Sequence, residues 1–172
     1  MNVRLRALEI KDIDTLYDWE NDKELWNVSC TTAPFSRYVL EQYIETSHLD
    51  IYSNGQLRFM IETTAKNSVT VGMVDLYGFE PFHMRAGVGI MIHKSSRQKG
   101  YATEALDLLL EYAFGFLNLK QLFCEIAEDN LTSITLFTKK GFTSTGIRKE
   151  WVRRGNRWLD AHFLQLINKD YQ

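Results

Sequence analysis

The sequence predicts an α/β (α+β) fold in which helices flank a mixed, mostly antiparallel central sheet. Three observations lead to this prediction: consecutive β-rich runs between about Leu57 and His93, a strongly apolar-striped helix after them, and a C-terminal hairpin pattern. With 172 residues, 45% of them hydrophobic, the chain has the length and apolar content of one domain covering residues 1–172. The predicted order of elements is βααβββαβαββ.

The N-terminal third is expected to form one strand and two helices. Val3, Leu5 and Ala7 alternate with arginines, which is typical of a short strand. Apolar residues then recur at helical spacing behind Asp12, a candidate N-cap. A second helix is predicted behind Ser36, which can cap it in the same way.

The remaining two thirds are expected to add six further strands and two helices. The runs "LRFMIET", "VTVGMVDLYGF" and "AGVGIMIH" are separated by short polar segments and indicate an antiparallel meander. An apolar stripe from Ala102 to Ala113 is the strongest helix signal, and "KQLFCEIA" is typical of a strand. Asn130 is expected to cap a helix that Gly141 ends, and "RRGNR" to turn the final hairpin.

Composition indicates which kinds of ligand and which cellular compartment to expect. The formal net charge is −2 and charged residues are scattered, so no basic face indicates binding to nucleic acid or a membrane. No apolar run approaches the roughly 20 residues of a membrane helix, and no signal peptide is recognisable. Cys30 and Cys124 lack CxxC or metal-ligand spacing, so we expect neither a disulfide framework nor a metal site. The expectation is a cytoplasmic protein that binds a small molecule.

The stretch "SSRQKGYATEAL" joins a basic loop to the start of the predicted helix. Backbone N–H groups at a helix start lack intrahelical partners and, together with the helix dipole, bind anions. Gly100 lets the chain turn close to a ligand, while Arg97 and Lys99 add positive charge. The spacing fits neither GxxxxGKS/T nor GxGxxG, so we expect a pyrophosphate ligand other than ATP or NAD. An ordinary solvated turn is the alternative interpretation.

The hexapeptide from Arg97 to Ala102 resembles the R/Q-x-x-G-x-G/A acyl-CoA loop of the GNAT acetyltransferase superfamily. "DNLTSITLFTKKGF" is similar to the second signature of that superfamily, and both motifs lie in the family's order. The resemblance in element order extends from Val3 to Ile167. "RAGVGIMI", "WEND" and "PFS" are most similar to the polyamine and ribosomal-protein α-amino acetyltransferases.

This resemblance implies that acetyl-CoA is the co-substrate and lies between two splayed parallel strands, "GVGIMIH" and "LFCEIA". It implies that the basic loop holds the pyrophosphate, and that the backbone of the preceding strand pairs with the pantetheine like an added strand. The implied cofactor-binding residues are Met91, Ile92, His93, Arg97, Gln98, Lys99, Gly100, Tyr101, Ala102, Asn130, Ser133 and Phe137.

Transfer of acetyl from a thioester to an amine needs a neutral amine, so a base must take a proton from a group whose pKa is about 10. By resemblance to the α-amino acetyltransferases, which place a catalytic Glu at the same spacing before Asn130, we expect Glu125 to be that base. The alternative is that Glu125 faces solvent, because alternation does not fix which face of its strand is buried. Asp75 and Glu80 are secondary candidates that could instead bind a cationic substrate.

Two positions depart from the family's pattern. Many members carry Tyr where this chain has Phe137, and that Tyr is taken to protonate the departing thiolate, which Phe137 cannot do. Many relatives carry Glu where Gly87 stands. A thiol with a pKa near 8.5 can leave as the thiolate without a general acid. We therefore expect the missing acid to lower the rate on the order of 10²-fold rather than to abolish activity. Cys124 could accept the acetyl group, but a buried strand cysteine usually serves packing.

The acceptor amine stays open at this stage. The segment "DWENDKELW" carries four acids that either attract a polycation or form a solvated helix end. Trp26 is a candidate substrate-binding residue, since an aromatic face beside carboxylates can hold an ammonium group. Three arginines in "KEWVRRGNRWLD" favour instead an acceptor with a carboxylate or phosphate.

The candidate acceptors are therefore a polyamine, a peptide or protein α-amine and an amino-sugar antibiotic. A non-catalytic acyl-CoA-binding sensor is the alternative from another functional class, because it would keep the loop and lose the chemistry at Gly87 and Phe137. A homodimer is expected by resemblance alone.

Overall fold

The structure is a computed structural model that describes residues 1–29 and 31–171, so Cys30 lies outside the described residues. Its centre is a seven-stranded sheet in the order β1-β2-β3-β4-β5-β7-β6. Only β4 and β5 pair in parallel among the strands described; every other neighbouring pair is antiparallel. The strands are β1 (Val3–Ala7), β2 (Leu57–Thr63), β3 (Thr70–Glu80), β4 (Arg85–Ile92), β5 (Gln121–Ala127), β6 (Thr143–Arg154) and β7 (Arg157–Ile167).

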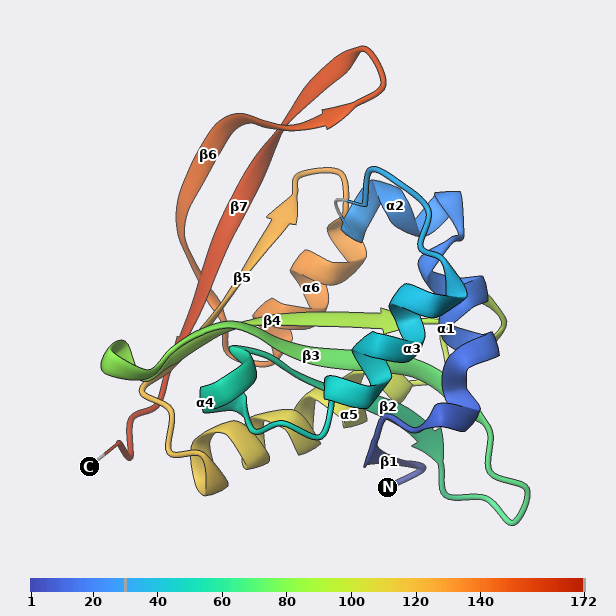
Figure 1. The fold of residues 1–172 in the computed structure, drawn as a ribbon. Coiled ribbons are helices and arrows are strands. Elements are labelled where there is room, and N and C mark those ends of the chain that lie inside the picture. Colours follow the sequence, from blue (N-terminus) through green and yellow to red (C-terminus); the bar gives the residue numbers. More distant parts are fainter. Residues whose placement is uncertain (30, 172) are drawn as a thin grey trace.

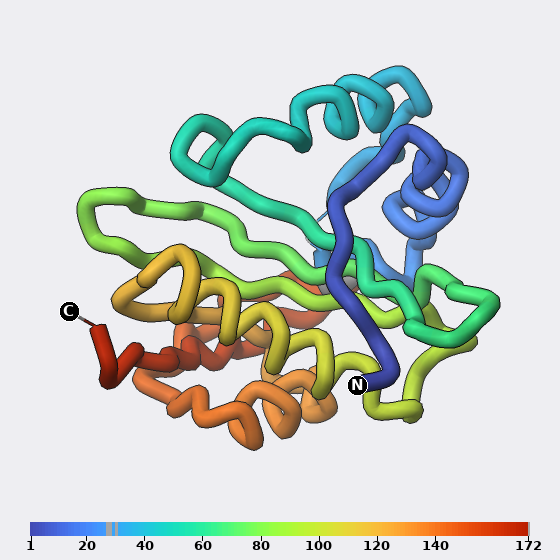
Figure 2. Tube along the Cα trace, turned by 90° about the horizontal axis from the view of Figure 1, so that it is seen from below, coloured from blue at the N-terminus to red at the C-terminus, as the bar shows by residue number. Residues whose placement is uncertain are grey.

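Helices cover both faces of the sheet (Figures 1 and 2). One face carries α1 (Ile13–Glu20), α2 (Lys23–Ser29), α3 (Arg37–Thr46) and α4 (Ile51–Asn54), and the other carries α5 (Tyr101–Leu110) and α6 (Leu131–Lys139). The predicted mixed, mostly antiparallel sheet with flanking helices is confirmed. The short helices α2 and α4 and a π-helical continuation of α5 over Glu111–Phe116 are additions that the sequence pattern did not predict.

Local signals begin and end two helices as predicted. The Ser36 hydroxyl accepts a hydrogen bond from the backbone N–H of Val39 at 3.2 Å. The Asn130 side-chain oxygen accepts one from the backbone N–H of Ser133, also at 3.2 Å. Gly141, just after α6, has a φ of +92°, a left-handed conformation that glycine adopts without steric strain. Short polar side chains and glycine therefore set these helix ends locally.

Apolar side chains form a core on each face of the sheet. The larger core packs α5 and α6 against the sheet and includes Leu106, Leu109, Leu122 and Phe137. The smaller core packs α1 and α3 against the other face and consists of Leu8, Leu16, Trp19, Leu40, Ile44, Met60 and Met73. Each face of the sheet is thus fixed to its own helical layer. No helix within the described ranges is long and apolar enough to cross a membrane.

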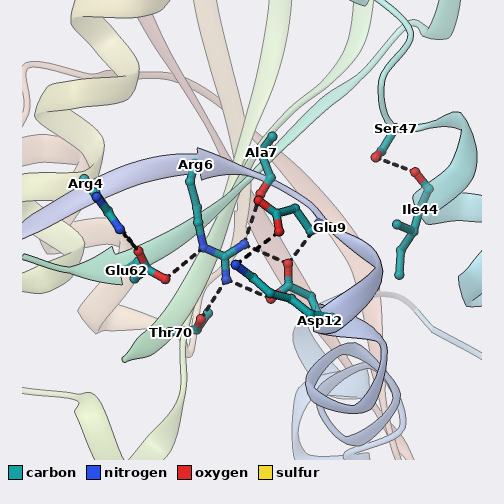
Figure 3. Close-up of polar contacts among 10 residues, drawn as sticks. Arg4, Arg6, Ala7, Glu9, Asp12, Ile44, Ser47, Glu62 and Thr70 are labelled. Carbon is teal, nitrogen blue, oxygen red and sulfur yellow. Dashed lines mark hydrogen bonds and ion pairs between the residues drawn. The ribbon is translucent and has the colours of Figure 1, made fainter. Parts of the chain in front are cut away.

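An ion-pair network ties β1 to the turn that precedes α1 (Figure 3). Arg6 donates through Nη1 and Nη2 to the two Asp12 carboxylate oxygens at 2.7 and 2.8 Å, and through Nε to Glu62 at 3.0 Å. The Arg6 side chain is only 14% exposed, and both carboxylates are buried. Asp12 occupies the N-cap position of α1 as predicted, but its side chain makes no capping hydrogen bond there, because this pairing and a hydrogen bond from the Glu9 N–H engage its carboxylate.

The network lowers the pKa of both carboxyl groups. Burial alone would raise the pKa of Asp12, but hydrogen bonds from Arg6 and Glu9 outweigh it. A hydrogen bond from Arg4 is the largest cause of the lowered pKa of Glu62; burial opposes it and Arg6 reinforces it. Because both pKa values lie below those of the unfolded chain, about 4, the network stabilises the fold above that pH and loses this contribution as pH falls.

Replacing Arg6 with Met is expected to lower the free energy of unfolding at pH 7 by about 3 kcal/mol, because two buried carboxylates lose their shared partner. Urea unfolding from pH 7 to pH 3 measures this, and the difference from the wild type should shrink as the carboxylates are protonated. Lys11→Met is the control: Lys11 is 61% exposed and pairs with the exposed Glu9, so its loss should cost less than about 1 kcal/mol. A penalty for Arg6→Met that is independent of pH would contradict the electrostatic explanation.

Candidate active site

The strands β4 and β5 pair over only part of their length. Their parallel register joins Arg85–Gly87 to Gln121–Phe123 and stops there. β4 continues along β3 as far as Ile92, and β5 continues along β7 as far as Ala127. The two strands therefore stay in the sheet but separate from each other, as the resemblance implied.

A pocket occupies this separation and passes from one face of the sheet to the other. It is lined by Trp19, Glu20, Leu25 and Ser29 from α1 and α2, Arg58, Met73 and Asp75 from β2 and β3, Val88, Gly89, Ile90 and Met91 from β4, Cys124, Glu125, Ile126 and Ala127 from β5, Asn130, Ser133 and Phe137 from α6, and Val152 and Arg154 from β6. Residues that are distant in the sequence thus meet at one site.

The backbone of β4 alternates between its partner strand and the pocket. The His93 N–H donates to β3 at 2.9 Å, and in an antiparallel ladder the backbone groups of Met91 point the same way. Those of Ile90 and Ile92 point toward β5. The Ile92 carbonyl accepts a hydrogen bond from Arg97 Nε at 3.1 Å. Of the predicted pantetheine-binding residues Met91, Ile92 and His93, only Ile92 therefore offers its backbone to an added strand.

The loop between β4 and α5 has the backbone shape expected of an anion site. Gly100 has a φ of +81° and immediately precedes α5, and Gln98 has a φ of +61°. Within residues 1–29 and 31–171 we find no acceptor for the backbone N–H groups of residues 98–102. The loop exposes Arg97, Gln98, Lys99 and Gly100, and the half-buried Tyr101 and Ala102 begin the helix. Several N–H groups without an acceptor and two cationic side chains thus lie in one short loop, a composition typical of an anion site.

The helix α6 contributes three predicted residues to the pocket wall. Asn130 uses its side-chain oxygen as the helix cap, so its amide nitrogen is the part that remains for a ligand. Ser133 and Phe137 follow on the same face of the helix. Phe137 is 3% exposed and packs edge-on against Phe142 at 5.0 Å between ring centroids. The aromatic ring is therefore fixed at the pocket without a hydroxyl group.

Glu125 points into the pocket on the face that α1 and α3 cover. The buried neighbours Cys124 and Ile126 belong to the larger core on the opposite face, and side chains alternate along a strand. The Glu125 side chain is 27% exposed, with Oε1 accepting from Trp151 Nε1 and Oε2 paired with Arg148 Nη1, each at 2.5 Å. The carboxylate is thus held in one orientation beside the pocket.

The partners of Glu125 come from an irregularity in β6 that the sequence did not indicate. The register of β6 against β7 shifts between Arg148 and Val152, and Glu150 within this bulge has a φ of +48°. The guanidinium of Arg148 stacks on the Trp151 ring at 4.8 Å. A bulge bends its strand and re-aims its side chains, so the C-terminal hairpin reaches back to the active site.

Gly87 is explained by an aromatic ring on the neighbouring strand. A Cβ atom at Gly87 would lie 2.4 Å from the ring of Tyr77, its cross-strand partner. Tyr77 also packs edge-on against Phe123 at 6.0 Å between centroids, where β4 and β5 separate. The Tyr77 ring therefore fills the space that a side chain at position 87 would need, and a glutamate does not fit there.

A half-buried ion triad lines the pocket. Arg58 donates through Nε to Asp75 at 2.6 Å and through Nη1 to Glu20 at 2.5 Å. The three side chains are 18%, 23% and 13% exposed, respectively. Burial opposes the positive charge of Arg58, but the two carboxylates outweigh it and raise its pKa. Two anions share one cation, which leaves one negative charge. The sequence-based prediction contained Asp75 but not its partner Arg58.

Two predicted substrate-binding residues lie outside the pocket lining. Glu80 ends β3 and pairs with Arg85 at 2.8 Å. Trp26 is half-buried, and its indole N–H donates to the backbone oxygen of Glu20 at 2.7 Å, while Leu25 beside it lines the pocket. Cys124 lines the pocket, but burial raises the pKa of its thiol to about 12. The thiol is therefore neutral near pH 7, which argues against an acetyl-cysteine route.

The loop geometry predicts that Gly100→Val weakens the binding of CoA at least about tenfold, because a β-branched residue is strained at positive φ. Open space surrounds Gly100, so the effect should come from the backbone rather than from a clash. Calorimetric titration with CoA measures it. Gly146→Val is the matched control, since Gly146 also has open space around it but lies on β6 without a positive φ. Equal CoA affinity in both variants would show that the loop does not bind the cofactor.

Comparison with known proteins agrees with this geometry. The family model for the acetyltransferase (GNAT) domain matches residues 2–143. The spermidine N(1)-acetyltransferase of Vibrio cholerae is 25% identical over 97% of this chain and 94% of that protein. The spermidine N(1)-acetyltransferase of Escherichia coli K12 is 29% identical over 84% of this chain and 75% of that protein.

One solved structure shows the same architecture with CoA bound. The crystal structure of the Vibrio cholerae spermidine N-acetyltransferase in complex with CoA and spermine superposes with a TM-score of 0.87 at 25% identity, covering 99% of this chain and 98% of that one. The family match, the splayed strands and the anion loop agree with one another. The chain belongs to the GNAT family of acetyltransferases and is an N-acetyltransferase that uses acetyl-CoA.

Proposed function

We propose that this enzyme transfers the acetyl group of acetyl-CoA directly to a primary amine of a polyamine. One observation carries the proposal: the carboxylates of Glu20, Asp75 and Glu125 line the pocket between β4 and β5. A half-buried site with excess negative charge attracts an acceptor that carries several ammonium groups. The names of the Vibrio cholerae and Escherichia coli relatives support the same class of acceptor.

Each side of the pocket has its own part in this mechanism. Bound acetyl-CoA supplies the acetyl group as a thioester. The loop at residues 97–102 binds the pyrophosphate, and the backbone of Ile92 holds the pantetheine, so that the thioester lies where the strands separate. The amine enters from the face covered by α1 and α2. Glu125 first takes a proton from the ammonium form, which frees the nitrogen lone pair. The neutral amine then attacks the thioester carbonyl, and the nitrogen loses its second proton to solvent as the C–S bond breaks and CoA leaves as the thiolate.

The leaving thiolate receives no proton from α6, because Phe137 stands where a donor would be needed. A thiol with a pKa near 8.5 is a tolerable leaving group as the anion, so the reaction proceeds with solvent as the final proton source. The absence of a hydroxyl at position 137 should lower the rate without changing the acceptor.

The arginines of the hairpin argue less strongly against a polyamine than the sequence indicated, because contacts within the protein engage two of them. Arg154 pairs with Asp129 at 2.8 Å, so its charge is already balanced. Arg153 donates to the backbone oxygen of Gly155 at 3.2 Å, within the turn of the hairpin. The charge that faces the pocket is therefore more acidic than the sequence count of "KEWVRRGNRWLD" implied.

Release of the CoA thiol tests the proposal, with acetyl-CoA and a panel of spermidine, spermine, peptides with free N-termini and aminoglycosides. Turnover is expected with the polyamines at the highest kcat/KM. Faster turnover with a peptide or an aminoglycoside would contradict the proposal and identify that class of amine as the acceptor. Tight CoA binding by calorimetry without turnover on any amine would identify a non-catalytic sensor.

Self-association and a cytoplasmic location remain predictions. A solved form of the Vibrio cholerae relative is described as dodecameric, and we propose that this chain also forms oligomers. The edge strand β6 is almost fully exposed and could take part in the contact. Light scattering of the purified chain would distinguish an oligomer from a monomer.

Glu125→Gln is expected to lower kcat by at least about 10², since the amine then loses its proton acceptor. The affinity for CoA should change little, and the residual rate should rise with pH toward the pKa of the amine, about 10, because only the neutral amine then reacts. Steady-state rates across the pH range, with CoA titrations, measure both. Glu128→Gln changes an exposed acid nearby and serves as the control. An unaltered pH profile in Glu125→Gln would exclude Glu125 as the base.

Glu20→Gln is expected to raise the KM for spermidine about tenfold, which corresponds to about 1.4 kcal/mol, with little change in kcat. Arg58 keeps Asp75 as a partner in this variant, so the fold should be retained. The KM for butylamine, which has no second ammonium group, should be unaffected. Glu41→Gln, on the exposed face of α3, is the control. Equal increases in KM for both amines would show that Glu20 does not recognise the second charge.

A further inference from the structure

Two consecutive residues after β4 contact the helical segment formed by residues 13–29, which we call the acceptor wall. The imidazole of His93 stacks on the indole of Trp19, with 5.5 Å between ring centroids and 13° between the planes. The next residue, Lys94, places Nζ 3.9 Å from the Asp22 carboxylate. The segment that leads into the cofactor loop therefore contacts the wall at two neighbouring points.

On the acceptor side, both contacted residues organise the wall. Trp19 is 8% exposed, belongs to the smaller core and lines the pocket next to Glu20. Asp22 begins α2, where its side chain accepts a hydrogen bond from the backbone N–H of Glu24 at 2.9 Å and its carbonyl one from Leu25, also at 2.9 Å. A shift of Trp19 or Asp22 would move the pocket residues Glu20 and Leu25.

On the cofactor side, hydrogen bonds fix both the backbone and the side chain of His93. Its backbone N–H donates to β3, and its Nδ1 lies 2.9 Å from the Ser95 hydroxyl, which orients the ring. The preceding residue is Ile92, whose carbonyl holds Arg97 of the anion loop. A ligand on the Ile92 backbone and on the loop would therefore restrain the imidazole that stacks on the wall.

We infer that His93 is a positioning residue that couples binding of CoA to the order of the acceptor wall. The stack joins the wall to the segment that bound CoA would restrain, so CoA further stabilises the arrangement of the amine site around Glu20. Such coupling is reciprocal: a bound acceptor strengthens CoA binding by the same factor. The role of the wall in holding the amine rests on the proposed function, but the coupling itself does not depend on which amine binds.

Hydrogen–deuterium exchange of the full chain, with and without CoA, tests this coupling without an acceptor. In the wild type, CoA should slow exchange in residues 13–29 at least about fivefold, a typical size for such coupling. His93→Phe keeps an aromatic partner for Trp19 and should retain the effect, whereas His93→Ala should lose it with CoA affinity changed less than about threefold. His48→Ala, an exposed histidine after α3, is the control and should behave as the wild type.

Three outcomes would overturn the inference: unchanged exchange in residues 13–29 of the wild type with CoA bound, full protection in His93→Ala, or loss of protection in His93→Phe and His93→Ala alike. A wild type that does not bind CoA would overturn it together with the cofactor site. Failure of the polyamine proposal is separate, since it is read from turnover on the amine panel. Protection that depends on His93 in a protein inactive toward polyamines would keep the coupling and change only the acceptor.

Discussion

The limited pairing of β4 with β5 is the constraint on which the active site depends. Parallel hydrogen bonds join these strands through Gly87 and Phe123 and then cease, although each strand continues in the sheet along its other neighbour. A strand edge left open inside a sheet presents unpaired N–H and C=O groups, which are free to bind an extended chain. The pantetheine arm of CoA has amide groups that suit this edge, and we propose that the basic loop beyond Ile92 binds its pyrophosphate.

Packing on both sides of the separation keeps it open. The Tyr77 ring lies on Gly87 and against Phe123, so the point of divergence is filled with aromatic carbon. On one face the larger core fixes β5 to α6, and on the other the smaller core and the Arg58 triad fix β2 and β3 to α1. In the mechanism that we propose, the acceptor and the cofactor therefore approach from opposite faces and meet at the gap. Their separation allows each site to have its own charge: cationic at the loop, acidic at the wall.

Local signals made much of this structure predictable from the sequence. The caps at Ser36 and Asn130 and the glycine at position 100 act through neighbouring residues, so their patterns are visible in the chain. The predicted position of Glu125 beside the pocket rested on resemblance, and the structure places it there. The helix ends were therefore predictable from neighbouring residues, and the position of Glu125 from the family's order of elements.

What the sequence did not predict depends on contacts between distant residues. The triad joins Arg58 to Glu20 across 38 positions, and the bulge that brings Trp151 to Glu125 joins the C-terminal hairpin to β5. Asp12 was predicted as a cap because it precedes a helix, yet it pairs with Arg6 because β1 lies beside that turn. Pairings of this kind follow from the topology of the sheet, which no local pattern specifies.

Amide-resolved hydrogen exchange of Ile90, Met91, Ile92 and His93 on titration with CoA would test the central claim most directly. If the open edge of β4 binds the cofactor as an added strand, exchange at the Ile90 or Ile92 amide should slow with CoA. The Met91 and His93 amides, already paired with β3, should change much less. Saturating CoA that leaves both the Ile90 and Ile92 amides unprotected would contradict the account, because the cofactor would then lie away from the gap between β4 and β5.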